Sequence, residues 1–320
     1  RARPRAMAQG PAPRGVCAVA CPLCPDVVEW CPAQGCEDLL AYGLYELDEA
    51  SGQRRGLLRL ARAAAAEAED EDGEDPADPP TLTLSTEAEV ELPGVYDVAW
   101  APAAAAGGEA SALLAVASAD GGLRLARADG SVAAACPLSE GSILTHVAWG
   151  AGGREGLAAV GQDGAAHHVR LRESGELEPL ARREAHGLEA WSVEVSPAEP
   201  QLVLSGADDG CLFGWDLREP PGAAPALANR KAHEAGVTAL ACDPLDPHRL
   251  ASGSYDERVR LFDLRTMART PLAESERLGD GAYHLSWHPC WPGVLAVAAM
   301  RSGLPLLAAG GGGEIAVEAL

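Results

Sequence analysis

Two groups of His, Ser and Asp side chains recur in this sequence at matching spacing: His186, Ser205 and Asp209 in the first group, and His233, Ser252 and Asp256 in the second. A His that bonds both a Ser and an Asp is the arrangement of the hydrolytic triad, which cleaves esters and amides. The same side chains can instead bond one another to satisfy buried polar groups inside a repeated unit. An enzyme needs a single catalytic triad, whereas this sequence contains the group twice. We therefore interpret the following as structural hydrogen-bonding residues: His186, Ser205, Asp209, Trp215, His233, Ser252 and Asp256.

The repetition extends well beyond these groups. SGADDGCLFGWDLR begins at Ser205, and 47 residues later the chain reads SGSYDERVRLFDLR. Aspartates equivalent to Asp209 and Asp256 occur at Asp120 and Asp163, at intervals of 43, 46 and 47 residues. Alternating, strand-like segments precede them in phase, and they end at Trp30, Trp100, Trp149, Val195, Cys242 and Trp287. A period of about 40 to 45 residues with four short strands per unit is typical of a WD-repeat β-propeller.

The sequence therefore predicts an all-β fold, a WD-repeat β-propeller with six recognisable units. We expect these units to begin near Asp26, Val95, Ile143, Leu188, Val237 and Tyr283. Each complete unit should contain four antiparallel strands. We also expect the units to form part of a seven-bladed ring whose last blade is missing from this chain.

Composition divides the chain around this propeller. Residues 1–25 contain several Arg, Pro and Gly and are expected to be a disordered leader, and residues 309–320 a Gly-rich tail. The propeller itself is expected to span 26–308. An acidic insertion at 61–80 carries eight acidic residues between Glu67 and Asp78, so we expect it to be disordered.

Charge and cysteine content exclude several classes of protein. The 320 residues carry a formal net charge of −22, which opposes binding to nucleic acid. No apolar run approaches the ~20 residues of a membrane helix. Nine Cys, an odd number, suit a reducing compartment, so we expect a cytoplasmic location. Cys21 and Cys24 form one C-x-x-C near Cys31 and Cys36, a weak zinc motif, and we expect no metal.

Several segments resemble one family closely. They are VEWCPAQGCEDLLAYGLYEL in the first unit, HGLEAWSVEV and SGADDGCLFGWDLR in the fourth, LASGSYDERVRLFDLR in the fifth and WHPCWPGVLAVAAMRSGL in the sixth. Together they resemble the WD-repeat diphthine methyl ester hydrolases of diphthamide biosynthesis, which were formerly named diphthine methyltransferases. The resemblance covers most of residues 26 to 308 and is weaker in the second and third units. It implies hydrolysis of the methyl ester of methylated diphthine on translation elongation factor two, with no cofactor.

Ester hydrolysis needs an attacking group and stabilisation of a tetrahedral oxyanion. The chain has no G-x-S-x-G motif, so either a Ser or Tyr outside that motif attacks, or a carboxylate or His activates water. Loops before the inner strands and turns after the second strands of a propeller share one mouth of its channel. We expect the candidate catalytic residues Glu189, Tyr255 and Ser302 there, with Glu189 as the base. The candidate substrate-binding residues are Trp191, Tyr283 and Arg301.

Two functions without catalysis remain open. The chain could be a structural scaffold, or it could be a substrate receptor of a cullin-RING ubiquitin ligase that binds its adaptor through Trp215–Arg218. Trp215-Asp216-Leu217-Arg218 matches the W-D-x-R pattern of such receptors, and Phe262 to Arg265 matches it with one substitution. A methyl-release assay separates the enzyme from both alternatives, and an adaptor pulldown separates the two binding functions.

Overall fold

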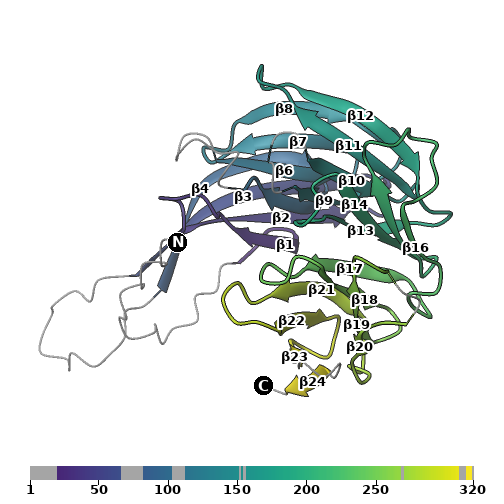
Figure 1. Ribbon diagram of the computed structural model, residues 1–320. Coiled ribbons are helices and arrows are strands. Elements are labelled where there is room, and N and C mark those ends of the chain that lie inside the picture. Colours follow the sequence, from purple (N-terminus) through teal and green to yellow (C-terminus); the bar gives the residue numbers. More distant parts are fainter. Residues whose placement is uncertain are drawn as a thin grey trace, which may run out of the picture.

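The computed structural model describes residues 20–65, 82–102, 112–150, 153, 156–267, 270–309 and 315–318. Their strands form six four-stranded antiparallel sheets (Figure 1), as the sequence predicts. No helix long and apolar enough to span a membrane occurs in the described part of the chain. The all-β prediction is confirmed.

Each sheet is built from four strands that follow one another in the chain, and the first strand of each is its inner strand. The first sheet consists of β1 (Cys24–Trp30), β2 (Leu39–Leu47), β3 (Arg54–Ala65) and β4 (Leu82–Pro93). The second consists of β5 (Val95–Trp100), β6 (Leu113–Ser118), β7 (Gly122–Arg127) and β8 (Val132–Pro137). The third consists of β9 (Leu144–Trp149), β10 (Leu157–Gly161), β11 (Ala165–Leu171) and β12 (Leu177–Glu184).

The remaining three sheets repeat this plan. The fourth consists of β13 (Ala190–Val195), β14 (Leu202–Ala207), β15 (Leu212–Asp216) and β16 (Leu227–Asn229). The fifth consists of β17 (Val237–Cys242), β18 (Arg249–Ser254), β19 (Val259–Asp263) and β20 (Ala273–Glu274). The sixth consists of β21 (Ala282–Trp287), β22 (Val294–Ala299), β23 (Leu306–Ala309) and β24 (Ile315–Glu318). The inner strands begin within two residues of the predicted unit starts.

Three expected boundaries are corrected by these strands. β1 begins at Cys24, inside the expected leader. β3 continues to Ala65, inside the expected acidic insertion at 61–80, because it pairs with β4 from Arg55 to Ala65. The expected tail at 309–320 supplies β24, which pairs with β23 because Ile315 packs into the core. Residues 1–19 and 66–81 lie outside the described residues, so the expected disorder there stays a prediction.

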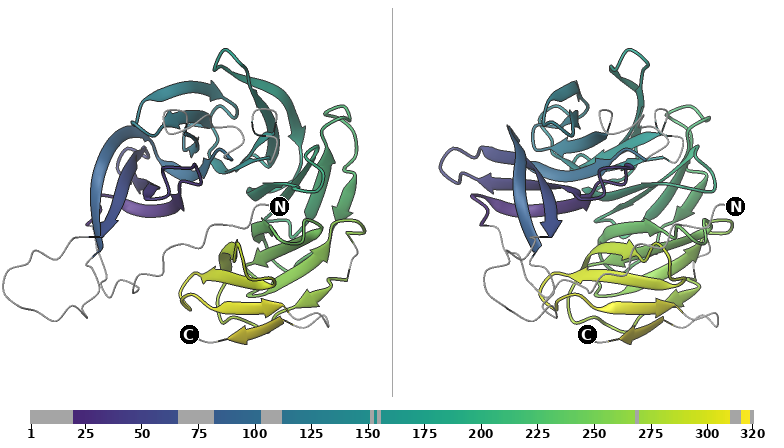
Figure 2. Two further views of the ribbon diagram at one scale, coloured as in Figure 1. Left: turned by 60° about the vertical axis from the view of Figure 1, so that its left-hand side comes forward. Right: turned by 90° about the vertical axis from the view of Figure 1, so that its left-hand side faces the viewer.

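The six sheets follow one another around an arc, from the purple first sheet to the yellow sixth (Figure 2). Neighbouring sheets pack through their inner strands in chain order, from β1 against β5 to β17 against β21. The apolar clusters lie between sheets: Leu58 and Leu60 of the first sheet pack with Val98 and Trp100 of the second. Burial of these side chains is the main contribution that holds each blade against the next.

A tryptophan at the end of an inner strand joins it to the preceding blade. The indole Nε1 of Trp100 donates to the Glu29 carbonyl at 3.2 Å, and that of Trp149 to the Ala99 carbonyl at 2.8 Å. Trp287 donates in the same way to the Ala241 carbonyl at 3.0 Å. Trp30 occupies the equivalent position of the first blade, where it is 53% exposed.

Every inner strand also contains one β-bulge near its start. In each of the six strands one residue is skipped in the pairing with the second strand of the sheet. The skipped residues, which we call the bulge ring, are Asp26, Tyr96, Thr145, Trp191, Thr238 and Tyr283. A bulge bends the strand and re-aims a side chain. The repeated bulge therefore turns one side chain per blade toward the centre of the arc.

Candidate functional site

The two repeated His, Ser and Asp groups lie inside their blades. His186 Nε2 is 2.8 Å from Ser205 Oγ and its Nδ1 is 3.1 Å from Asp209 Oδ2. Trp215 Nε1 donates to the same Ser205 hydroxyl at 3.0 Å. These contacts satisfy buried polar atoms within one sheet and its connections, which is what a structural group does.

The second group has the same geometry and adds one partner. His233 Nε2 is 2.7 Å from Ser252 Oγ, and its Nδ1 is 3.0 Å from Asp256 Oδ2. Arg260 also bonds the Asp256 carboxylate, at 2.5 Å. Bonds to His233 and Arg260 hold the pKa of Asp256 well below its usual range, against the opposing effect of burial.

A third group of this kind escaped the sequence analysis. Ser139 Oγ donates to Asp163 Oδ2 at 2.7 Å and lies 3.0 Å from His167 Nε2. Ser139 precedes the inner strand β9, as His186 precedes β13, whereas His167 lies on the third strand β11 of its sheet and Ser205 lies on the second strand β14. Its order along the chain is Ser, Asp, His, which differs from the His, Ser, Asp order of the other two groups, although Asp163 is equivalent to Asp209. Three copies support a structural role for all of them.

The side chains that could catalyse a reaction lie instead around a cavity of about 260 Å³ between the inner strands. The whole bulge ring lines it, and so does the residue that follows each bulge. We call this second set the inner ring: Val27, Asp97, His146, Ser192, Ala239 and His284. Val28, Leu240, Tyr255 and Ala298 complete the lining. Side chains from all six blades therefore meet in one place.

Asp97 and His146 are adjacent members of the inner ring. The Asp97 carboxylate accepts a hydrogen bond from the Val147 N–H at 2.9 Å, and its Oδ2 lies 3.7 Å from His146 Nε2. Burial raises the pKa of Asp97 to about 7. His146 Nδ1 accepts from the Val193 N–H at 3.4 Å, and burial lowers the pKa of His146 to about 4. At neutral pH His146 is thus a neutral imidazole whose proton is on Nε2, facing Asp97.

His284 completes this group from the sixth blade. Burial and the neighbouring His146 lower its pKa, and the charge of Asp97 partly opposes them. The His284 side chain lines the cavity, whereas the structural His186 and His233 are buried within their blades. A neutral, accessible imidazole near a carboxylate can take a proton from water.

Three other carboxyl groups on the inner strands also have raised pKa values. Burial raises the pKa of Asp26 to about 6 and those of Glu29 and Glu194 to about 8. The charge of Asp97 raises all three further. Among the described residues no group of three or more His, Cys, Asp or Glu side chains is arranged to hold a metal ion.

The residues proposed from the sequence divide into two sets. Trp191, Tyr255 and Tyr283 line the cavity, and Trp191 Nε1 donates to Asp208 Oδ1 at 2.8 Å. Three others are not among the lining residues: Glu189, Arg301 and Ser302. Glu189 still lies close enough for its charge, after burial and Asp208, to raise the pKa of Tyr255. The Arg301 side chain is 92% exposed and reaches Asp280 at 4.0 Å.

The sequence analysis missed Asp97, His146 and His284, although a signal for them was present. Aligning the six inner strands on their terminal residues places all three at the same position, three residues before the end. A charged or His side chain at that position of a strand between apolar neighbours is unusual. These three residues lie within the strands, whereas the three catalytic candidates expected from the sequence lie between strands.

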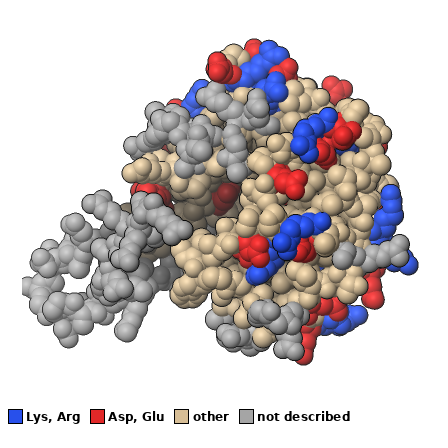
Figure 3. Space-filling view, viewed as in Figure 1, with Lys and Arg blue, Asp and Glu red and all other residues tan. Residues whose placement is uncertain are grey.

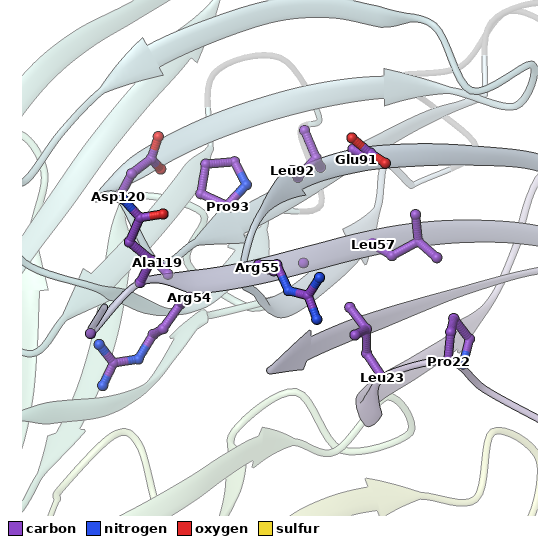
Figure 4. A pocket seen from close by; sticks show the side chains of 13 residues that line it. Pro22, Leu23, Arg54, Arg55, Leu57, Glu91, Leu92, Pro93, Ala119 and Asp120 are labelled. Atoms are coloured by element: carbon purple, nitrogen blue, oxygen red, sulfur yellow. The ribbon is translucent and has the colours of Figure 1, made fainter. Parts of the chain in front are cut away.

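A larger cavity, of about 770 Å³, lies beside the ends of β3 and β4. Figure 4 shows Arg54, Arg55, Glu91 and Asp120 around it together with apolar side chains. Its lining includes no Ser, Cys, His or Tyr, so it offers neither a hydroxyl or thiol nucleophile nor a histidine base for ester hydrolysis. On the face shown in Figure 3, Lys and Arg lie beside Asp and Glu and form no broad basic patch.

Comparisons with known proteins agree with the fold and the resemblance. The family described as WD domain, G-beta repeat matches residues 226–263, which include β16 to β19. A chain from the crystal structure of the mitotic checkpoint complex superposes with a TM-score of 0.66 at 16% identity, covering 92% of this chain and 79% of that one. At this identity the likeness shows the fold alone.

Two curated relatives carry the same name, diphthine methyltransferase. The human protein is 33% identical over 305 residues, covering 89% of this chain and 66% of its own length. The mouse protein is 30% identical over 311 residues, covering 91% of this chain and 62% of its own length. The chain thus spans just under two thirds of the length of these relatives. From this identity over nearly all of its length, together with the propeller fold, the chain belongs to the WD-repeat family named diphthine methyltransferase.

Proposed function

We propose that the chain acts in diphthamide biosynthesis and hydrolyses the methyl ester of methylated diphthine on translation elongation factor two. The relatives named diphthine methyltransferase support the pathway. The observation that carries the reaction class is the cavity in which Asp97, His146 and His284 meet. These three side chains are sufficient for hydrolysis, in which water accepts the acyl group, and no other acceptor is needed.

The three side chains divide the work of hydrolysis. His284, neutral at pH 7, takes a proton from water, and the water oxygen forms a bond to the ester carbonyl carbon. The Asp97 carboxylate stabilises the imidazolium that results. The Nε2–H of His146 donates to the oxyanion of the tetrahedral intermediate, as a neutral imidazole can. The C–O bond to the methoxy group then breaks, and that group leaves as methanol with the proton from His284.

Aromatic side chains position the substrate in this proposal. Trp191 and Tyr283 flank the cavity from the fourth and sixth blades, and Tyr255 contributes from the turn after β18. The net charge of −22 gives a field that attracts a basic partner surface around the modified residue. The modified residue of the elongation factor would enter the cavity between the aromatic side chains of Trp191, Tyr255 and Tyr283.

Release of methanol from the methyl-esterified elongation factor tests this function. We expect release by the wild-type chain and a fall of about 10² or more in His284→Gln, since removal of a general base costs that much. His288→Gln is the matched control, because His288 lies in a loop outside the cavity and bonds Cys290. Failure of the folded wild-type chain to release methanol would exclude the proposal.

Glu189 remains the alternative base, and the same assay separates the two. Glu189→Gln should retain wild-type release if His284 is the base, because Glu189 is not among the lining residues. Loss of release in folded Glu189→Gln together with retention in His284→Gln would assign the base to Glu189.

A ligase adaptor site is the second candidate, since two equivalent Arg side chains are exposed. The side chains of Arg218 and Arg265 are 67% and 66% exposed, each paired with its own strand-end aspartate at 2.6 Å. Adaptor pulldown with wild-type chain and Arg218→Ala tests this function. Equal recovery with both proteins would exclude a role for Arg218.

A further inference from the structure

Asp208 occupies a position of the repeat whose residue type differs from unit to unit. It directly precedes Asp209, the aspartate that bonds His186 inside the fourth blade. The residues at the same place in the other units that carry this aspartate are Ala119, Gln162 and Tyr255. The aspartate that follows is the same in all four units, whereas the side chain before it is different in each. The presence of Asp208 is therefore explained by what it contacts and not by the repeat.

The Asp208 carboxylate holds the indole of Trp191. Trp191 Nε1 donates to Asp208 Oδ1 at 2.8 Å. Asp208 is itself fixed through its backbone, because its N–H donates to the Glu189 carbonyl at 2.9 Å. Trp191 belongs to the bulge ring and lines the cavity between the inner strands, whereas Asp208 is not among the lining residues. The orientation of this ring toward the cavity therefore depends on a carboxylate that lies behind the cavity wall.

The fifth blade leaves room for this carboxylate because residue 236 is glycine. A Cβ on Gly236 would overlap Asp208 Oδ1, the same oxygen that accepts from Trp191. It would also lie 3.2 Å from the Tyr255 ring. Gly236 does not have a positive φ, so glycine is required here for space and not for backbone conformation. A side chain at this position would push the carboxylate away from the indole.

We propose that Asp208 is a positioning residue for the reaction, which fixes Trp191 in the orientation that presents its ring to the substrate. The inference rests on the proposed function, in which Trp191 flanks the ester. An indole N–H needs a hydrogen-bond acceptor, so without Asp208 the ring would turn toward another acceptor or toward water. Asp208 touches neither the ester nor the attacking water, so its effect should appear mainly in KM.

Methanol release at several concentrations of the methyl-esterified elongation factor tests this role. In Asp208→Ala we expect KM to rise about tenfold and kcat to stay within about twofold of the wild type, because the contact with Trp191 is lost while the proton-transfer groups remain. Asp208→Asn should keep KM within about twofold of the wild type, since its amide oxygen still accepts from the indole. An Asn variant with the KM of the Ala variant, or an Ala variant with the wild-type KM, would overturn the proposal.

Two glycines provide a matched pair of variants in which Asp208 is retained. Gly236→Ala should displace the Asp208 carboxylate and so reproduce the rise in KM of about tenfold. Gly187→Ala is the control, because Gly187 has no positive φ and a Cβ there meets nothing within 4 Å. If Asp208→Ala does not fold, Gly236→Ala replaces it in the test. Equal KM values for folded Gly236→Ala and Gly187→Ala would overturn the proposal.

The hydrogen bond of Trp191 can also be measured without any hydrolysis. In a chain with isotope-labelled tryptophan, the indole N–H resonance of Trp191 is the one that disappears in Trp191→Phe. Its exchange with solvent should be at least about tenfold faster in Asp208→Ala and Gly236→Ala than in the wild type, and unchanged in Asp208→Asn and Gly187→Ala. Wild-type exchange in folded Asp208→Ala would show that Asp208 does not hold the ring.

The two measurements separate this proposal from the hydrolase. A wild-type chain that releases no methanol, but whose Asp208→Ala variant shows fast indole exchange, loses the proposed reaction and retains the hold of Asp208 on Trp191. A chain that releases methanol, but whose Asp208→Ala variant has the wild-type KM and exchange rate, retains the reaction and loses the role of Asp208.

Discussion

Asp97 is the single residue whose ionisation should control the reaction. Burial raises its pKa to about 7, and its carboxylate is the partner that stabilises a protonated His284. The rate should therefore rise as pH increases through about 7, when Asp97 becomes ionised. In Asp97→Asn we expect kcat/KM to fall about 10² or more and to lose this rise. Rates measured between pH 5.5 and 9 check it, and an Asn variant with the wild-type pH profile contradicts it.

His233 should behave in the opposite way, because it is buried in its blade and bonded to Ser252 and Asp256. His233→Ala leaves these partners unsatisfied, so the free energy of unfolding should fall by ~1 to 3 kcal/mol. Activity per folded molecule should stay at the wild-type level. Urea unfolding and methanol release measured on the same preparation give both quantities. A stable but inactive His233→Ala would contradict the structural interpretation and indicate a catalytic role for this group.

At the scale of elements, the turn between β6 and β7 shows how closely neighbouring segments approach. Gly121 has φ +76°, and a Cβ there would lie 1.8 Å from the Ser139 carbonyl oxygen. Gly141 has φ +78° with open space around it. Gly141→Ala should cost about 1 to 2 kcal/mol for the left-handed backbone alone. Gly121→Ala should cost at least ~2 kcal/mol more, because backbone must also move.

Equilibrium unfolding of the two variants measures this difference directly. The same backbone conformation is strained in both, so their difference isolates the contact with Ser139. Equal stability of the two variants would contradict the prediction, because the backbone at Ser139 would then move aside with no loss of unfolding free energy.

The elements also show which parts of the structure the sequence could predict. The period and the strand ends were readable because alternation and terminal Trp residues are local patterns. The bulges were not, because a skipped residue such as Tyr96 depends on pairing with another strand. β24 was mistaken for tail because four Gly precede its short apolar pattern. Trp191, Tyr255 and Tyr283, which are expected from the sequence at the channel mouth, line the cavity, whereas Asp97 and His284 are found only when the inner strands are compared.

At the scale of the whole molecule, the buried ionisable groups set the pH of greatest stability. Asp26, Glu29, Asp97 and Glu194 have raised pKa values, between about 6 and 8. The folded state binds their protons more tightly, so their stabilisation is fully present below the ordinary pKa values of 3.8 and 4.5 and is lost as pH rises from there to about 8. His146 and His167 have pKa values lowered to about 4, so their effect is lost as pH falls from about 6.5 to 4.

The four carboxyl groups outnumber the two imidazoles, so the free energy of unfolding should be greatest near pH 4 to 5 and should fall as pH rises to about 8. Urea midpoints at pH 4.5, 5.5, 7 and 8.5 measure the curve. The double variant Glu29→Gln and Glu194→Gln should flatten the fall above pH 6, because Gln does not ionise. A midpoint that increases from pH 5.5 to 8.5 in the wild-type chain is incompatible with this account.

The tryptophan bonds between blades all point in one direction along the chain. Trp100, Trp149 and Trp287 each donate to a carbonyl of a blade made earlier. During synthesis on the ribosome, each of these side chains emerges when its acceptor is already outside the exit tunnel. A new blade can therefore dock as soon as its inner strand appears, without waiting for later sequence. Assembly can proceed vectorially from the N-terminal side, so that nascent chains expose one unfinished blade at a time.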